Sequence, residues 1–188
     1  MSICKRRVPP NQKITSDFPI LHVGSVPRFD PETWAFLVEG LVENPIQLSY
    51  GEILKLPKVT CKSDFHCVTG WSKLNNTWEG VGFATILNLV KPLKTVKFAT
   101  AECEGGYTTS LPLEDLLSDD VVLAYKLDGE SLSPDHGGPL RLVVPRKYAY
   151  KSAKWVRKLI FTAKQELGYW EERGYSNTAD PWKEERYS

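Results

Sequence analysis

One reactive side chain, Cys67, stands at the start of a segment rich in glycine and tryptophan. Cys67 follows His66 and opens the stretch CVTGWSKLNNTWEGVGF, which contains two tryptophans and three glycines. A thiolate is a nucleophile and a ligand for soft metals. Glycines allow the backbone to approach a flat or charged group closely, and indole rings can wall a planar ligand. A free cysteine is most often a small buried hydrophobe, but these neighbours favour a chemical role for Cys67.

Two other chemistries of this cysteine stay open on the sequence alone. Cys61, His66 and Cys67 are close together, with Cys103 and His136 further on, so a zinc site must be considered. No pair has the CxxC spacing, and adjacent residues of an extended segment point to opposite faces, which disfavours zinc. A cysteine hydrolase that uses Cys67 with His136 needs a nucleophile at a helix start and an orienting asparagine, and neither is obvious.

A second stretch, residues 135–156, reads DHGGPLRLVVPRKYAYKSAKWV and is rich in donors for an anion. It combines the backbone amides of Gly137-Gly138 and the Ser152 hydroxyl with five cations, which are Arg141, Arg146, Lys147, Lys151 and Lys154. Such a set predicts a phosphate cradle. A strand pair with solvated lysines is the alternative, but lysines set among small and aromatic residues favour a ligand. The nucleotide motifs GxxxxGKS/T and GxGxxG are absent from the sequence.

Three short helices are predicted among the elements that must position these residues. Ser49 and Glu52 form a capping-box pattern, and Pro57 ends the helix that follows. Apolar residues at helical spacing predict a second helix over residues 82–90. The segment 111–117 is predicted to be a third helix, because a proline stands at its start.

Strands outnumber these helices, so the predicted class is α+β, mainly β, with mixed sheets and short helices. The segment 121–132 is predicted to be a hairpin that turns at Asp128-Gly129. In the last strand, Trp155 is expected to share one face with Leu159 and Phe161. The other extended segments are predicted at residues 33–40, 59–68, 95–102 and 140–145, and the second of these leads into the loop that carries Cys67.

Composition and charge exclude several classes of partner and compartment. The 188 residues carry 24 basic and 23 acidic side chains, for a net charge of +1, so nucleic acid and membrane surfaces are not predicted partners. The N-terminal residues lack the apolar run of a secretory signal, and no stretch approaches the length of a membrane helix. We therefore expect a cytoplasmic location, in which four cysteines do not form a disulfide framework.

Together these motifs resemble those of one family. The segment HCVTGWS…TWEGVGF is similar to the molybdenum-binding segment of the sulfite oxidase family of molybdopterin oxidoreductases. The segment HGGPLRLVVPRKYAYKSAKWV resembles the pterin-phosphate segment of the same family, and the tail GYWEERGYSNTADPW resembles the ending of its small single-domain members. The resemblance implies one molybdopterin-binding domain over residues 1–188, with an irregular arm at 1–17 and a packed aromatic tail at 168–188.

The resemblance also implies roles for individual residues. Cys67 would be the one protein thiolate on molybdenum, with two further sulfurs from the pterin dithiolene, and the nearby glycines and indoles would shape a slot for the pterin. Residues expected to contact or surround the cofactor are His22, His66, His136, Arg141, Ser152, Ala153 and Lys154. A possible substrate pocket near the metal would use Arg146, Lys147 and Tyr148, for which ordinary surface positions are the alternative.

The function implied by the resemblance is oxygen-atom transfer to or from a small sulfur oxyanion or a sulfoxide, with molybdenum cycling between Mo(VI) and Mo(IV). No haem domain or flavin site is recognised, so the expected partner is an external electron donor or acceptor protein. Two alternatives remain: a cofactor-binding or carrier protein without turnover, and a structural protein with a vestigial site. The sequence does not name the substrate, the direction of transfer or the oligomeric state.

Overall fold

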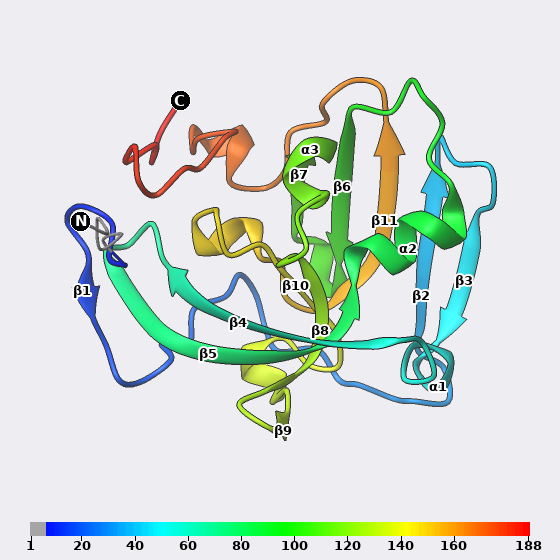
Figure 1. The fold of residues 1–188 in the computed structure, drawn as a ribbon, viewed down its shortest axis with the longest axis horizontal. Helices are drawn as coiled ribbons and strands as arrows, with labels where there is room; N and C mark the ends of the chain where they lie inside the picture. Colours follow the sequence, from blue (N-terminus) through cyan, green and yellow to red (C-terminus); the bar gives the residue numbers. More distant parts are fainter. Residues whose placement is uncertain (1–6) are drawn as a thin grey trace, which may run out of the picture.

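The computed structural model describes residues 7–188, so residues 1–6, including Cys4, lie outside the described part of the chain. Two mixed β-sheets make up the fold, and only short helices accompany them (Figure 1). The predicted α+β class, mainly β with mixed sheets and short helices, is therefore confirmed.

The first sheet has five strands in the order β3-β2-β11-β6-β7. β2 and β11 run parallel, and the other neighbours in this sheet are antiparallel. Its strands are β2 (Ala35–Gly40), β3 (Ile46–Ser49), β6 (Phe98–Cys103), β7 (Thr108–Pro112) and β11 (Val156–Thr162).

The second sheet has six strands and is organised around the long strand β5, which pairs with β1, β4 and β8. The β4–β5 hairpin extends across the lower left of the view in Figure 1. The strands are β1 (Lys13–Ile14), β4 (Lys58–His66), β5 (Trp71–Gly82), β8 (Val122–Leu127), β9 (Glu130–Ser131) and β10 (Arg141–Val143). β1 lies inside the arm that was expected to be irregular.

The predicted helices are confirmed and are as short as their local signals indicate. The α-helices are α1 (Tyr50–Ile53), α2 (Phe83–Val90) and α3 (Leu113–Leu116), and the 3-10 turns are η1 (Glu104–Gly106), η2 (Pro134–His136), η3 (Ala149–Lys151) and η4 (Glu171–Arg173). Ser49 and Glu52 make both bonds of the capping box at α1. No helix within residues 7–188 is long and apolar enough to cross a membrane.

Two apolar clusters hold the sheets together. The larger one draws on both sheets, with Phe36 of β2, Leu159 of β11 and Leu123 of β8 all buried. The smaller one is built around Phe65 and Trp78, on β4 and β5. It lies at the end of the β4–β5 hairpin that leads to Cys67, so the cysteine is attached to a rigid part of the fold.

The segment after Cys67 is a strand, which corrects the expected glycine-rich loop. Residues 71–82 form β5, because the backbone of this segment pairs with strands on both sides. Gly80 is needed for strand packing and not for a ligand, since an added Cβ would lie 2.1 Å from the carbonyl oxygen of Leu123. Trp78 is fully buried in the smaller cluster, so of the two indoles only Trp71 is placed to wall a cavity.

A second correction concerns the start of β11. Trp155 does not share a face with Leu159 and Phe161, because its φ of 56° and a register shift between Val156 and Lys158 interrupt the alternation. Val156 instead joins the core with Leu159 and Phe161. A positive φ is uncommon for a bulky residue, and here it turns the Trp155 indole toward the cavity described below.

The contact at Gly80 predicts a large stability difference between two glycine substitutions. Gly80→Ala should lower the free energy of unfolding by about 1–3 kcal/mol or more, since the β8 backbone must move to admit the methyl group. Gly51→Ala is the control, because Gly51 lies in α1 with open space around it and should gain at most about 1 kcal/mol. Urea unfolding of both variants measures the difference, and equal stabilities would contradict the packing role of Gly80.

Candidate functional site

One cavity of about 300 Å³ gathers most of the predicted site residues. Its walls come from the segment before β2, the turn after β4, the region around η3 and the C-terminal segment. The predicted residues that line it are His22, Cys67, Arg141, Ser152, Ala153 and Lys154. The fold therefore brings together side chains from distant parts of the sequence.

Cys67 stands directly after β4, at the start of a tight turn into β5. Its amide donates to the carbonyl of Trp71 at 2.8 Å, and the amide of Gly70 donates back to the carbonyl of Cys67 at 3.0 Å. The thiol is 6% exposed, and the hydroxyl of Thr69 donates to its sulfur at 3.1 Å. Burial raises the pKa of the Cys67 thiol, while the Thr69 bond acts in the opposite direction. A metal ion would be needed to hold this sulfur as a thiolate at neutral pH.

Residues near both ends of the described chain donate hydrogen bonds to the backbone carbonyls of this turn. From the N-terminal arm, Gln12 donates from Nε2 to the carbonyl of Cys67 at 3.0 Å, and the amide of Lys13 donates to the carbonyl of Gly70 at 2.9 Å. From the C-terminal segment, Arg186 donates to the carbonyl of Val68. We call Gln12, Lys13 and Arg186 the turn clamp. None of them was predicted from the sequence, because no local pattern marks a residue that acts on a distant carbonyl.

Arg141 lines the cavity and is buried without a carboxylate partner among residues 7–188. It is 3% exposed, its Nη1 donates to the carbonyl of His136 at 3.0 Å, and its Nε has no partner among the described residues. The guanidinium lies over the rings of Phe65 and Phe18, at 4.9 and 5.5 Å from their centroids. Burial lowers the pKa of Arg141 to about 10, far below its usual value.

Lys154 is the second cation of the cavity. Its Nζ donates to the backbone carbonyl of Asp135 at 2.5 Å, and its pKa falls to about 8, first through burial and then through repulsion by Arg141. Gly137 makes room for the lysine stem, since a Cβ there would lie 3.0 Å from Lys154. Arg141 is buried, Lys154 is half-buried, and both donate only to carbonyls. Their charges are therefore under-compensated, and an anionic group such as a phosphate would complete this environment.

The region beside these cations is rigid. Ser152 and Ala153 are both 2% exposed; the Ser152 hydroxyl accepts from the amide of Val144 at 2.9 Å, and the carbonyl of Ala153 accepts from the amide of Leu142 at 2.9 Å. The expectation that Gly137-Gly138 exposes free amides is wrong, because both amides donate to carbonyls of η2 and its N-cap, Pro134 and Ser133. The predicted cradle therefore depends on side chains more than on the glycine backbone.

The three predicted histidines occupy different positions. His22 lines the cavity with an exposed ring that packs on Trp155, with ring centroids 5.3 Å apart. His66 does not line it: its ring is buried, with Nδ1 2.8 Å from the hydroxyl of Ser72. His136 stands behind the wall, with its ring 5.0 Å from that of Phe18 and a buried Nδ1 that has no partner among the described residues.

The three candidate substrate-pocket residues lie outside the cavity wall. Arg146 is exposed and pairs with Asp120 at 3.2 Å, and Lys147 pairs with Asp115 at 2.8 Å. Tyr148 is completely buried. The structure thus gives no geometric support to their role in a substrate pocket, which stays a prediction.

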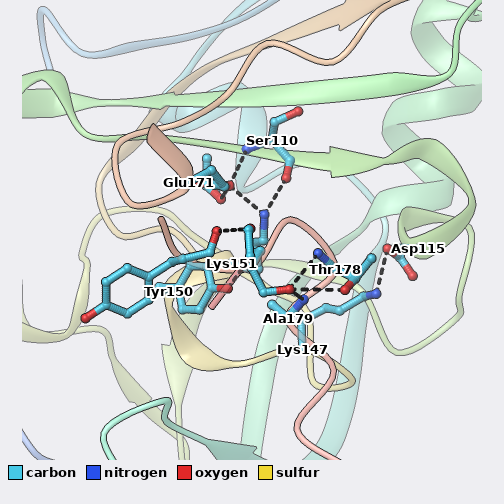
Figure 2. Close-up of polar contacts among 12 residues, drawn as sticks. Ser110, Asp115, Lys147, Tyr150, Lys151, Glu171, Thr178 and Ala179 are labelled. Carbon is cyan, nitrogen blue, oxygen red and sulfur yellow. Dashed lines mark hydrogen bonds and ion pairs between the residues drawn. The ribbon is translucent and has the colours of Figure 1, made fainter. Parts of the chain in front are cut away.

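A buried ion pair that the sequence did not reveal joins two walls of the cavity (Figure 2). Nζ of Lys151, in η3, lies 2.5 Å from Oε1 of Glu171, in η4, and the two side chains are 1% and 0% exposed. Glu171 also accepts from the hydroxyl of Thr109. Lys151 donates to the carbonyl of Ser110, which Figure 2 shows as a dashed line. Because Glu171 belongs to the C-terminal segment, the pair fastens that segment to the region just before Ser152.

The same segment supplies aromatic side chains to the cavity. Trp170 and Tyr175 line it, and their rings pack on each other with centroids 4.8 Å apart. Tyr107 completes this side and donates from its hydroxyl to the carbonyl of Tyr150 at 2.6 Å. The high aromatic content of the tail was the available signal for these contacts.

The alternative chemistries find little support in this geometry. Within residues 7–188, no group of three or more His, Cys, Asp or Glu side chains is arranged to hold a metal ion. That disfavours zinc, which takes most of its ligands from the protein. A hydrolase is disfavoured too, because the Cys67 sulfur faces Thr69 and His136 does not line the cavity.

Comparison with known proteins agrees with the fold and the cavity. The family described as "Oxidoreductase molybdopterin binding domain" matches residues 23–170. The chain belongs to this family and is a molybdenum-dependent oxidoreductase of the sulfite oxidase type, which confirms the class predicted from the motifs.

Individual relatives extend this finding. The "Uncharacterized oxidoreductase YuiH" of Bacillus subtilis is 44% identical over 183 residues, which cover 97% of this chain and 92% of that protein. The "Putative protein-methionine-sulfoxide reductase subunit YedZ1" of Azospira oryzae is 32% identical over 89% of this chain, but only 64% of that protein is covered.

The fold is also similar to that of a solved structure, the sulfane dehydrogenase SoxCD from Paracoccus pantotrophus. The TM-score is 0.70 and the identity is 26%, over 76% of this chain and 41% of that chain. This likeness confirms the predicted molybdopterin-binding fold. The present chain spans well under two thirds of that protein.

The buried ion pair predicts strong non-additivity in stability. Lys151→Met alone should cost about 3–5 kcal/mol, because it leaves the Glu171 carboxylate buried without its cation. The double variant Lys151→Met/Glu171→Leu should cost much less, since no charge is left behind. Lys158→Met, which breaks surface pairs only, is the control and should cost less than about 1 kcal/mol. Urea unfolding that gave simply additive costs would contradict this prediction.

Because the charge of Lys154 is under-compensated, we predict that it contributes to retention of the cofactor and does not stabilise the cofactor-free protein. Lys154→Met should leave the thermal midpoint of the cofactor-free protein unchanged or higher, because it removes a half-buried charge that Arg141 repels. The same change should reduce retention of pterin during dialysis by about tenfold or more, the usual scale of a charge-assisted bond. Lys94→Met, at an exposed site, is the control for both measurements. Full retention in the Lys154 variant would rule out a role in holding the anion.

Proposed function

We propose that this chain binds molybdenum through the Cys67 sulfur and holds a molybdopterin with Arg141, Ser152, Ala153 and Lys154, and that it catalyses oxygen-atom transfer to or from a small sulfur oxyanion or sulfoxide. The observation that carries the proposal is the shared cavity, which is lined by one buried sulfur, one buried cation and one half-buried cation, and both cations bond only carbonyls. A soft-metal ligand beside under-compensated cations matches a metal joined to a phosphorylated organic group.

In this proposal each residue has a defined task. Arg141 and Lys154 neutralise the phosphate, and Trp155 and His22 provide flat and polar surface for the pterin. Cys67 supplies the protein ligand, which its turn holds in a fixed direction. When bound, the molybdenum centre supplies the two-electron redox change that accompanies oxygen-atom transfer. The chain contributes binding, orientation and exclusion of water.

The substrate class is supported by the names of the relatives. Those from Azospira oryzae and Paracoccus pantotrophus refer to a protein methionine sulfoxide and to a sulfane, both of which are sulfur compounds. The name of the first of these also describes a subunit, in agreement with the proposed external electron partner. The predicted cytoplasmic location stays a prediction.

The test is a measurement of the metal and pterin content of protein made in a molybdate-fed host that synthesises the cofactor. Unchanged protein should contain about one molybdenum per chain, with a thiolate-to-metal absorption band, and Cys67→Ser should lose the band. Cys61→Ser is the matched control, because Cys61 is also a buried thiol but donates to the carbonyl of Asp120 and does not line the cavity.

Each outcome of the metal and pterin measurement has a distinct meaning. Molybdenum with sulfoxide or sulfite turnover supports the whole proposal. Molybdenum and pterin without turnover by any donor or acceptor identifies the carrier alternative. Unchanged protein that contains neither metal nor pterin overturns the proposal and leaves Cys67 as a packing residue.

A further inference from the structure

We propose that Thr69 tunes the metal through an O–H···S hydrogen bond to the Cys67 sulfur, an inference that rests on the function proposed above. The Thr69 hydroxyl is 3.1 Å from Cys67 Sγ and is the donor. Thr69 also lines the cavity, so it touches the site that the cofactor would fill. Its role would be that of a positioning and tuning residue, not of a reacting group.

The turn that carries both residues restricts how far they can separate. The amide of Cys67 donates to the carbonyl of Trp71, and the amide of Gly70 donates to the carbonyl of Cys67, so residues 67–71 form a hydrogen-bonded turn. Gly70 adopts a φ of 97°, which a glycine accepts without strain. Thr69 is β-branched, so its χ1 has few alternatives once the backbone is held.

The turn clamp then fixes this small unit relative to the rest of the molecule. Gln12 occupies the carbonyl of Cys67, Arg186 that of Val68 and Lys13 that of Gly70. The carbonyls on both sides of Thr69 are therefore held by donors from outside the turn. Because the backbone cannot rotate freely, the hydroxyl remains directed at the sulfur.

A second set of bonds supports the clamp residue Gln12. The hydroxyl of Ser72 donates to Gln12 Oε1 at 3.2 Å, and it lies 2.8 Å from Nδ1 of His66. Since the Ser72 hydroxyl has one proton and gives it to Gln12, His66 must be the donor at Nδ1. The direction of every bond from His66 to the Cys67 carbonyl is thus determined, which favours one orientation of Gln12.

A donor at a thiolate sulfur changes the metal in a predictable direction. It withdraws electron density from the sulfur, which weakens donation to the metal and stabilises the reduced state. Removing the donor should therefore move the reduction potential of the metal to a more negative value. The thiolate-to-metal absorption band should move to longer wavelength, because the sulfur electrons are less tightly held.

Thr69 offers a clean substitution because its side chain is exposed while the sulfur is buried. Thr69→Val keeps the shape and the β-branch but removes the donor, and Thr69→Ser keeps the donor. Thr33→Val is the matched control, since Thr33 is an exposed threonine whose hydroxyl donates to Asp30 at 3.1 Å, outside the cavity wall. All three variants should unfold at the same temperature as the unchanged protein.

The experiment measures metal content, the absorption spectrum and the reduction potential of the loaded protein for all four forms. Thr69→Val should retain molybdenum but show the negative shift of the potential and the red shift of the band. Thr69→Ser should restore both values, and Thr33→Val should leave both unchanged. A purely structural role of Thr69 would alter the unfolding temperature or the metal content without this spectral pattern.

Two negative results are distinguishable. If the unchanged protein contains molybdenum and Thr69→Val has the same potential and spectrum, the inference about Thr69 is wrong, and the proposed function stands. If the unchanged protein contains no molybdenum, both proposals are overturned together.

Discussion

The desolvation of three cations within fourteen residues is the constraint on which this structure depends. Arg141 and Lys154 line one cavity and Lys151 lies just before its wall residue Ser152, and transferring such groups out of water is costly unless they are paired. Lys151 obtains a buried carboxylate, Glu171, whereas Arg141 and Lys154 obtain only backbone carbonyls. The difference separates the cation that is neutralised within the fold, Lys151, from the two cations that we propose bind an anion.

This division explains the layout of the molecule around the cavity. The Lys151–Glu171 pair fastens the C-terminal segment, which brings Trp170 and Tyr175 to the wall. Two of the aromatic rings under Arg141, Phe65 and Trp78, belong to the β4–β5 hairpin, whose turn begins at Cys67. The Cys67 sulfur and the Arg141 guanidinium are consequently placed by the same hairpin.

The sequence predicted best the features whose signals are local. The capping box at Ser49 and the turn at Asp128 need only their neighbours, and the motif around Cys67 and the one from His136 to Lys154 are contiguous. Gln12, Glu171 and Arg186 could not be found, because each acts on an atom at least 20 positions away. β5 was misread as a loop, since Gly80 reflects close contact with β8 and Gly82 lies against Val59 of β4, and both contacts are properties of the assembled sheet.

The turn clamp has a consequence for the order of events in the cell. Its members come from both extremes of the described chain, so the turn at Cys67 is complete only after residue 186 has left the ribosome. A nascent chain that already displays Cys67 still lacks Arg186 and the tail walls of the cavity. Under the proposed function, the complete cavity for the cofactor therefore forms only after this segment has been translated.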